Sequence, residues 1–198
     1  MDFFSNSATL IISTLGGLYL GAVLLRLLLQ IARADFYNPL SQAVVQLTDP
    51  LVRPLRGLIP SYKNIDLACV VLAICVHALA ICTLILSYGS QIPSAGLVLT
   101  WAIVGTLLVI IKIYYYAILG SIIMSFVMMF SGSMNPHPML LLIWQLTEPI
   151  MAPVRQIIPP LGGLDLSPIL IFLIIRLLQD FFIGAFDLGR YSAVILGL

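Results

Sequence analysis

The sequence has 198 residues, of which 61% are hydrophobic and only 9% charged, with a formal net charge of +1. A soluble domain carries about 25% charged residues, so this chain has too little polar surface to coat a water-soluble globule. The near-neutral charge excludes a nucleic-acid surface built on bulk electrostatics, and we expect no nucleic-acid partner. Long apolar runs instead predict an all-α membrane protein that crosses the lipid bilayer several times.

The first half of the chain reads as an apolar run, a mixed segment and a second apolar run. A transmembrane helix needs about 20 apolar residues. Residues 8–31 and 67–87 each meet that length. Between them, residues 36–60 place leucines and valines at helical spacing among polar side chains. This pattern is typical of an amphipathic helix in the membrane interface.

Two prolines fall inside this amphipathic segment. Pro50 fits the first turn of a helix with Asp49 as its N-cap, and Pro54 removes a helical hydrogen bond four residues later. We therefore expect two short helical pieces joined by a bend, lying at the interface or dipping into it.

The second half has the same shape. A third span is predicted at 107–130, a second amphipathic segment at 139–159 and a fourth span at 166–186. Residues 91–106 remain as a connector. Its apolar part, 97–106, is either an extension of the third helix beyond the bilayer or a short interfacial helix.

The two amphipathic segments are copies of each other. Gln46–Leu67 aligns without a gap with Gln145–Leu166, and 10 residues recur 99 positions later. This density of matches across several prolines indicates a duplicated unit. Each unit has two spans and so keeps its orientation. We expect two parallel repeats, 1–90 and 107–198, each built as span, amphipathic segment and span.

The distribution of basic residues predicts the orientation. The connection between the first two spans contains Arg33, Arg53, Arg56 and Lys63, whereas the turn at 88–94 contains no Lys or Arg. The positive-inside rule places the amphipathic segments in the cytoplasm and both chain ends on the opposite side.

The repeated acids, prolines and arginines form the first candidate site. Seven residues, about two helical turns, separate each acid from its arginine, so the two can share one helix face. The set is either a paired surface that docks a partner or lipid, or an interfacial bend whose arginines meet lipid phosphates. Its members are Asp49, Pro50, Pro54, Arg56, Glu148, Pro149, Pro153 and Arg155.

Ionisable residues inside the spans form the second candidate: Arg26, His77, Lys112, Arg176 and Asp180. Arg26 lies near the end of its span, where its side chain can snorkel to the headgroups. Charges inside a bilayer are costly, so we expect Arg176 and Asp180 to pair and to face protein rather than lipid. The group is either a structural polar clamp or an ion or proton path, and His77 as a haem ligand is a further alternative.

Two aspartates directly precede predicted spans, and few other residues indicate catalysis or metal binding. Asp66 and Asp165 are expected to be helix N-caps, with ion-binding carboxylates as the alternative. The sequence has no HExxH, P-loop, GxGxxG or GxSxG motif, so we expect no enzyme activity. The cysteines lack metal-ligand spacing, so we expect no metal and no cofactor; they are Cys69, Cys75 and Cys82.

The duplicated pattern, QLT-acid-Pro…Pro-x-Arg…Ile-Pro…Asp-Leu, resembles the YggT family, also called YlmG-like. The segment Asp35-Phe36-Tyr37-Asn38-Pro39 and the position of Lys112 resemble it too. The resemblance covers nearly the whole chain and implies a small bacterial inner-membrane protein. It also implies roles linked to osmotic tolerance and potassium uptake, to cell-division gene neighbourhoods and, in plastids, to haem attachment and nucleoid distribution.

These roles share an organising character. We therefore expect a non-enzymatic membrane scaffold or assembly factor whose amphipathic segments bind lipid, a membrane-protein partner or a second copy of the chain. The alternative is an oligomeric protein that handles potassium ions or protons through its intramembrane polar residues.

Overall fold

The computed structural model describes residues 3–131, 137–158, 165–191 and 195, and these form helices without a single strand. The predicted all-α class is confirmed. The elements are α1 (Phe3–Ile31), α2 (Pro39–Arg56), α3 (Leu67–Ser87), α4 (Ala95–Ser131), α5 (Pro138–Ile157), α6 (Ser167–Ala185) and the short 3-10 helix η1 (Leu188–Tyr191).

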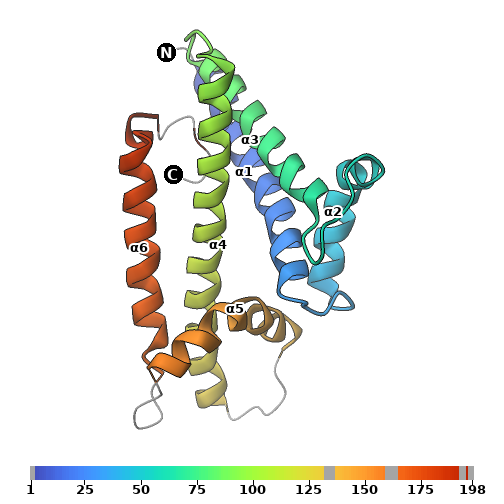
Figure 1. Cartoon of the computed structure of the whole chain (residues 1–198), viewed down its shortest axis with the longest axis vertical. Helices are drawn as coiled ribbons and strands as arrows, with labels where there is room; N and C mark the ends of the chain where they lie inside the picture. The colour runs from blue at the N-terminus through green and yellow to red at the C-terminus, as the bar shows by residue number, and fades with distance from the viewer. Residues whose placement is uncertain (1–2, 132–136, 159–164, 192–194, 196–198) are drawn as a thin grey trace.

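Four of the described helices are long and apolar enough to cross a membrane, which confirms the predicted number of spans. The qualifying stretches are Thr9–Ile31 in α1, Leu67–Ser87 in α3, Ala95–Phe126 in α4 and Ser167–Ala185 in α6. Figure 1 shows α4 and α6 running side by side, α1 and α3 leaning against the upper part of α4, and α5 crossing its lower part.

Each half of the chain makes the same set of helix contacts. In the first half α2 packs on both α1 and α3, and in the second α5 packs on both α4 and α6. The halves meet mainly where α3 packs against α4. Their arrangement as parallel repeats across a membrane stays a prediction.

The largest apolar core lies between α1, α3 and the first half of α4. Its fully buried members include Leu20, Val23, Ile81, Leu84 and Ala102. A smaller core lies where α4, α5 and α6 meet, around Ile118, Met151, Ile171 and Ile175.

The stretch 97–106 belongs to α4, a single helix of 37 residues. The stretch is therefore part of one helix rather than a separate one, but it belongs to the apolar stretch of α4 and is not the predicted extension beyond the bilayer. Trp101 and Ala102 are buried in the main core because α3 ends at Ser87 and α4 turns back along it from Ala95. The apolar stretch of α4 accordingly begins before residue 107.

The predicted bend in the first amphipathic segment is wrong, because α2 is continuous through both prolines. Its N-cap is Asn38 rather than Asp49, and the Asn38 side chain accepts a hydrogen bond from the Leu40 N–H at 3.0 Å. Pro50 and Pro54 lack the N–H groups that would bond to the carbonyls of residues 46 and 50. Gln46 and Pro50 are exposed, so water can solvate those carbonyls and the helix continues.

Three different faces run along α2. Ser41, Thr48 and Val52 are buried against the protein. Polar residues cover a second face, and the third is a row of exposed leucines: Leu40, Leu47 and Leu51. About half of each of these leucines remains exposed, and an apolar face left open beside a polar one is typical of a helix at a lipid interface.

Candidate functional site

Arg26 is buried rather than directed to the headgroups, so the snorkelling prediction is wrong. Its side chain is 4% exposed. Its Nη2 lies 2.7 Å from Oδ1 of Asp49, and its Nη1 donates to Oγ1 of Thr48 at 2.8 Å. Because α2 folds back onto α1, the Arg26 guanidinium binds the Asp49 carboxylate instead of a lipid phosphate. The pair joins the middle of α2 to the last third of α1.

Arg56 holds the far end of α2. Its Nε donates to Oδ2 of Asp66 at 2.8 Å, and Oδ1 of the same carboxylate accepts from the Ala68 N–H at 3.1 Å. Asp66 thus takes the N-cap position of α3 while it binds the last residue of α2. Burial alone raises the pKa of the Asp66 carboxyl, but hydrogen bonds from Arg56 and Cys69 and the Arg56 charge outweigh it and hold the pKa below its usual value.

Arg155 makes the corresponding contact in the second half. Its Nε donates to Oδ2 of Asp165 at 2.8 Å, and the Asp165 Oδ1 accepts from the Ser167 N–H at 2.9 Å. The N-cap residue of α6 is Leu166, so the prediction of Asp165 as the N-cap is wrong: α6 begins one residue later relative to the aspartate than α3 does. Burial raises the pKa of the Asp165 carboxyl, but the hydrogen bonds from Arg155 and Ser167 outweigh that effect and lower it. We call these two contacts, Arg56–Asp66 and Arg155–Asp165, the clasps.

The acids that precede the clasps have different partners in the two halves. Glu148 accepts a hydrogen bond from Nη1 of Arg155 at 2.8 Å, as the shared helix face predicts. Burial lowers the pKa of Arg155, but its bonds to Asp165 and Glu148 outweigh that and raise it. Asp49 pairs with Arg26, and the position 99 residues after Arg26 is Ser125. The first half therefore uses two arginines where the second half uses one.

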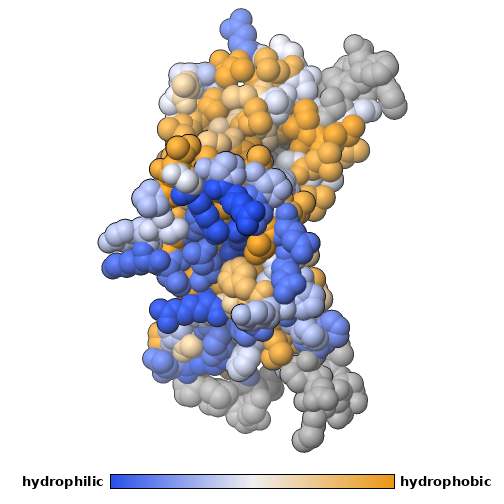
Figure 2. Space-filling view, turned by 90° about the vertical axis from the view of Figure 1, so that its right-hand side faces the viewer, coloured by the Kyte–Doolittle hydropathy of each residue, from blue (hydrophilic) through white to orange (hydrophobic). Residues whose placement is uncertain are grey.

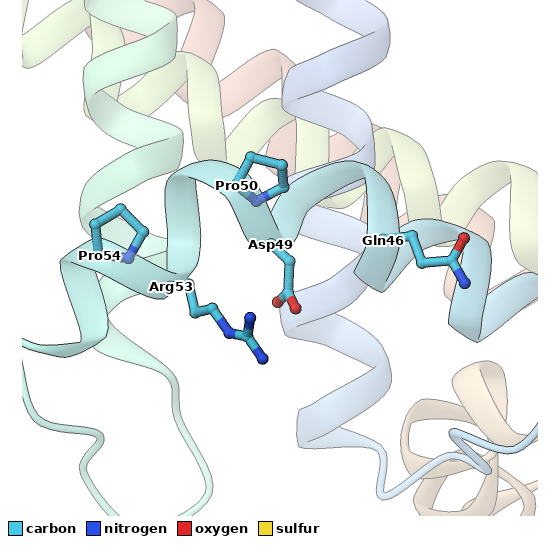
Figure 3. A pocket seen from close by; sticks show the side chains of 5 residues that line it. All are labelled: Gln46, Asp49, Pro50, Arg53 and Pro54. Carbon is cyan, nitrogen blue, oxygen red and sulfur yellow. The ribbon is translucent and has the colours of Figure 1, made fainter.

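The outward face of α2 forms an open hollow lined by Gln46, Asp49, Pro50, Arg53 and Pro54 (Figure 3). Asp49 and Arg53 point to the same side of the helix. The prolines leave backbone carbonyls of this face without their usual helical donors. The hollow thus presents a guanidinium, a carboxylate and bare carbonyl acceptors together.

Figure 2 views the molecule from the side that carries α2. Polar residues gather in the middle and lower part of this face, below a largely apolar upper part. The side of the molecule that carries α2 is therefore polar next to an apolar surface, as expected for a membrane boundary.

The prolines of α5 also lie inside a continuous helix. Pro149 and Pro153 are both exposed, and Thr147 is buried on the opposite side. Thr147 donates to the Ile143 carbonyl at 3.0 Å, as Thr48 does to Val44 at 2.8 Å. Residue 159, where the predicted second segment ends, lies outside the described residues.

His77 is completely buried between α3 and α4. Its Nδ1 lies 3.1 Å from Oγ1 of Thr106, and its ring packs against the backbone of Gly105. A Cβ built on Gly105 would meet the His77 Cε1 at 2.5 Å, so only glycine allows this approach. Lys112 is half-buried further along the same helix.

Arg176 and Asp180 form the expected pair, with 3.2 Å between Nε and Oδ2. The expectation that they face protein is wrong for the single chain: their side chains are 72% and 55% exposed. α6 turns Ile171 and Ile175 toward α4 and α5, which leaves the charged positions on the opposite side.

Sequence reasoning did not give a role to contacts between the two halves near the start of α5. The Asn38 side chain donates to the Pro138 carbonyl at 2.7 Å, and the Asp35 N–H donates to Oε1 of Gln145 at 2.9 Å. An Asn directly before a Pro is a recognisable helix start, so the sequence could have shown Asn38 as the N-cap of α2. Its bond to the Pro138 carbonyl could not be predicted in this way, because the two residues are 100 positions apart.

The fold and these contacts define a class of protein: a four-span helical membrane protein with two clasped amphipathic helices. Within the described residues, no three His, Cys, Asp or Glu side chains lie together as a metal site would require.

Comparison with known proteins shows that the chain belongs to the CCB3/YggT family, whose model matches residues 5–87 and 100–186. It is 42% identical to Uncharacterized protein PA0392 of Pseudomonas aeruginosa over 88% of this chain and 87% of that protein. It is 44% identical to a Vibrio alginolyticus protein named for the proC 3' region, over 85% and 89% of the two chains. It is 33% identical to Uncharacterized protein YggT of Escherichia coli over 88% of each chain. No solved structure matches.

Proposed function

We propose that this protein is a non-enzymatic scaffold of the bacterial inner membrane, and that the polar face of α2 binds a partner membrane protein at the cytoplasmic surface. The observation that carries the proposal is the hollow of α2, lined by Gln46, Asp49, Pro50, Arg53 and Pro54. This face is polar and open, although the helix behind it is fixed in place.

Rigid support favours binding over a merely structural role. Arg26 holds the middle of α2 through Asp49, and Arg56 holds its end through Asp66. A surface fixed before binding loses little conformational entropy when a partner docks. Leu47 and Leu51 are exposed on a neighbouring face, where they can enter the lipid. The helix would thus lie in the interface with its polar face available.

The chemistry of the hollow suggests the kind of segment that fits. Arg53 offers N–H donors, while Asp49 and the carbonyls freed by Pro50 and Pro54 offer acceptors. A polar loop or helix end of another membrane protein, carrying both donors and acceptors at the same depth, satisfies these groups. The basic residues around the hollow support the cytoplasmic side.

Ion handling, the alternative function, has weaker support. Arg26 is occupied by Asp49 and Thr48, and His77 lies against Thr106 and Gly105 with no exposed surface. Both side chains are enclosed by packed helices, whereas Arg176 and Asp180 are exposed on α6.

The test is recovery of partner proteins with the tagged full-length chain in native-lipid nanodiscs. Arg53→Glu should reduce recovery of the specific partner at least about 10-fold, because it reverses the only basic group of the hollow's lining. Lys63→Glu is the matched control, since it makes the same charge change at an exposed position nearby. Equal recovery with both variants, or no stoichiometric partner with the unaltered chain, would overturn the proposal.

A further inference from the structure

The outer face of α6 is the least covered surface of the four spans. Only 17% of its apolar stretch is buried, against 28%, 44% and 39% in α1, α3 and α4. In Figure 1, α6 lies at the edge of the molecule with α4 along one side. Large side chains remain exposed along the other side of α6: Ile169, Leu173, Leu177 and Phe181.

This apolar face carries a cation and an anion. Arg176 lies at the midpoint of α6, and Asp180 follows one helical turn later. The guanidinium has further N–H donors on its terminal nitrogens besides the Nε that faces Asp180. Hydrocarbon offers these groups no acceptors, and a charge at the centre of a span is costly.

The ionisable groups of the other spans are covered to a greater extent, and Lys112 in α4 is half-buried. Arg26 in α1 is 3% exposed and His77 in α3 is 0% exposed. The charged pair on α6 is therefore more exposed than the ionisable residues of the other spans. A second protein surface that covers α6 would bury the pair as well.

We propose that a second copy of this chain covers the outer face of α6, so that Arg176 of each copy pairs with Asp180 of the partner subunit. The face carries one positive and one negative charge, so two copies meet with their charges balanced. A two-fold axis along the membrane normal places equivalent residues at equal depth. One turn, about 5–6 Å, separates the two positions along the helix, which the long arginine side chain can span.

Apolar packing continues the contact on either side of the charges. Leu173 precedes Arg176 by three residues, and Leu177 and Phe181 directly follow the charged positions. α2 lies on the far side of the molecule from α6 (Figure 1), so the dimer leaves the hollow of α2 free. The dimer is thus a property separate from the proposed scaffold function, and either can fail alone.

A charge-reversal pair tests the contact directly. The full-length variant Arg176→Asp has two negative charges on α6, and the variant Asp180→Arg has two positive charges. A dimer of two identical variants therefore brings like charges together, whereas a dimer with one copy of each variant pairs opposite charges. We expect unaltered chains labelled with fluorophores to dimerise in dilute lipid vesicles. Each variant alone should dimerise about 100-fold more weakly, the factor expected from unpaired intramembrane charges. An equimolar mixture of the two should recover dimerisation. A monomeric unaltered chain, or variants that dimerise alone as well as it does, would overturn the proposal.

Cysteine cross-linking keeps the test decisive if a variant fails to insert. Leu177→Cys on α6 is compared with Leu18→Cys on α1, because the two replaced side chains are similarly exposed, at 60% and 67%. Both variants are made in chains without the native cysteines. We expect oxidation in membranes to yield a disulfide-linked dimer from Leu177→Cys and none from Leu18→Cys. Equal yields, or a product of Leu177→Cys that contains a different protein, would contradict the dimer.

Discussion

Arg56 binds the carboxylate that opens the next helix: its Nε lies 2.8 Å from Oδ2 of Asp66. One side chain thereby fixes where α2 ends and where α3 begins. The same hydrogen bond recurs 99 residues later between Arg155 and Asp165, although α5 continues to Ile157 and Leu166 is the N-cap of α6. The duplicated spacing therefore encodes a joint between an amphipathic helix and a span.

The first clasp should matter more for stability than the second. Arg56→Gln leaves Asp66, which is 0% exposed, without its counter-charge, and we expect the free energy of unfolding to fall by about 2 kcal/mol. Arg155→Gln should cost about 1 kcal/mol or less, because water screens Asp165, whose side chain is 33% exposed.

Unfolding of the purified proteins in mixed micelles measures both values. Arg53→Gln is the control, because it makes the same chemical change at an exposed position of α2. Equal losses for Arg56→Gln and Arg155→Gln would show that burial of Asp66 does not determine the strength of the clasp.

Local patterns explain why part of this architecture could be predicted from the sequence. The four spans follow from hydropathy and length, which need no knowledge of neighbours. An aspartate directly before an apolar run, as at Asp66, suggests an N-cap for the same reason.

The rest depended on contacts between distant segments. Asp49 lies 23 residues from Arg26, so its pairing could not be seen before α2 was placed on α1. Whether Pro50 bends a helix depends on whether the carbonyl it leaves unbonded faces water, and that is a property of packing. The exposure of Arg176 likewise follows from which side of α6 meets α4.

The clasp should also make the protein sensitive to acid. The folded state holds the pKa of Asp66 below its ordinary value of 3.8, so this stabilisation is complete above that value and is lost as pH falls through the lower folded value. Asp66→Asn should therefore be less stable at neutral pH and should lose less stability below pH 4 than the unaltered chain does. Unfolding measured from neutral pH to about pH 2 tests this. Parallel pH profiles of the two proteins would contradict the role of the Asp66 charge.

Gly105 should tolerate no side chain. In Gly105→Ala the added Cβ meets His77 Cε1 at 2.5 Å, and we expect a loss of about 1–3 kcal/mol in unfolding free energy. Gly96→Ala in the same helix is the control, because nothing lies within 4 Å of its Cβ, and it should be neutral or slightly stabilising. Adding His77→Ala to Gly105→Ala should restore part of the loss. Thermal unfolding in micelles gives all three values, and a harmless Gly105→Ala would disprove the close packing.

The prolines of α2 should lower the stability of the protein while they contribute to partner binding. Pro50→Ala supplies the missing N–H to the carbonyl of Gln46, so we expect the helix to gain about 1–3 kcal/mol. The same change removes a free acceptor from the hollow and should weaken partner recovery. Unfolding and nanodisc recovery are measured on the same preparation. A variant that is more stable and recovers its partner fully would show that the free carbonyl is not used in binding.

Site-specific photo-crosslinking in native membranes shows whether the polar face of α2 contacts a partner protein. A photoreactive residue at Gln46 reports from the hollow, and one at Lys63 reports from the exposed loop nearby. We expect one discrete cross-linked protein from position 46, absent from position 63 and lost when Arg53→Glu is added. The same products from both positions, or cross-links from position 46 to lipid alone, would contradict it.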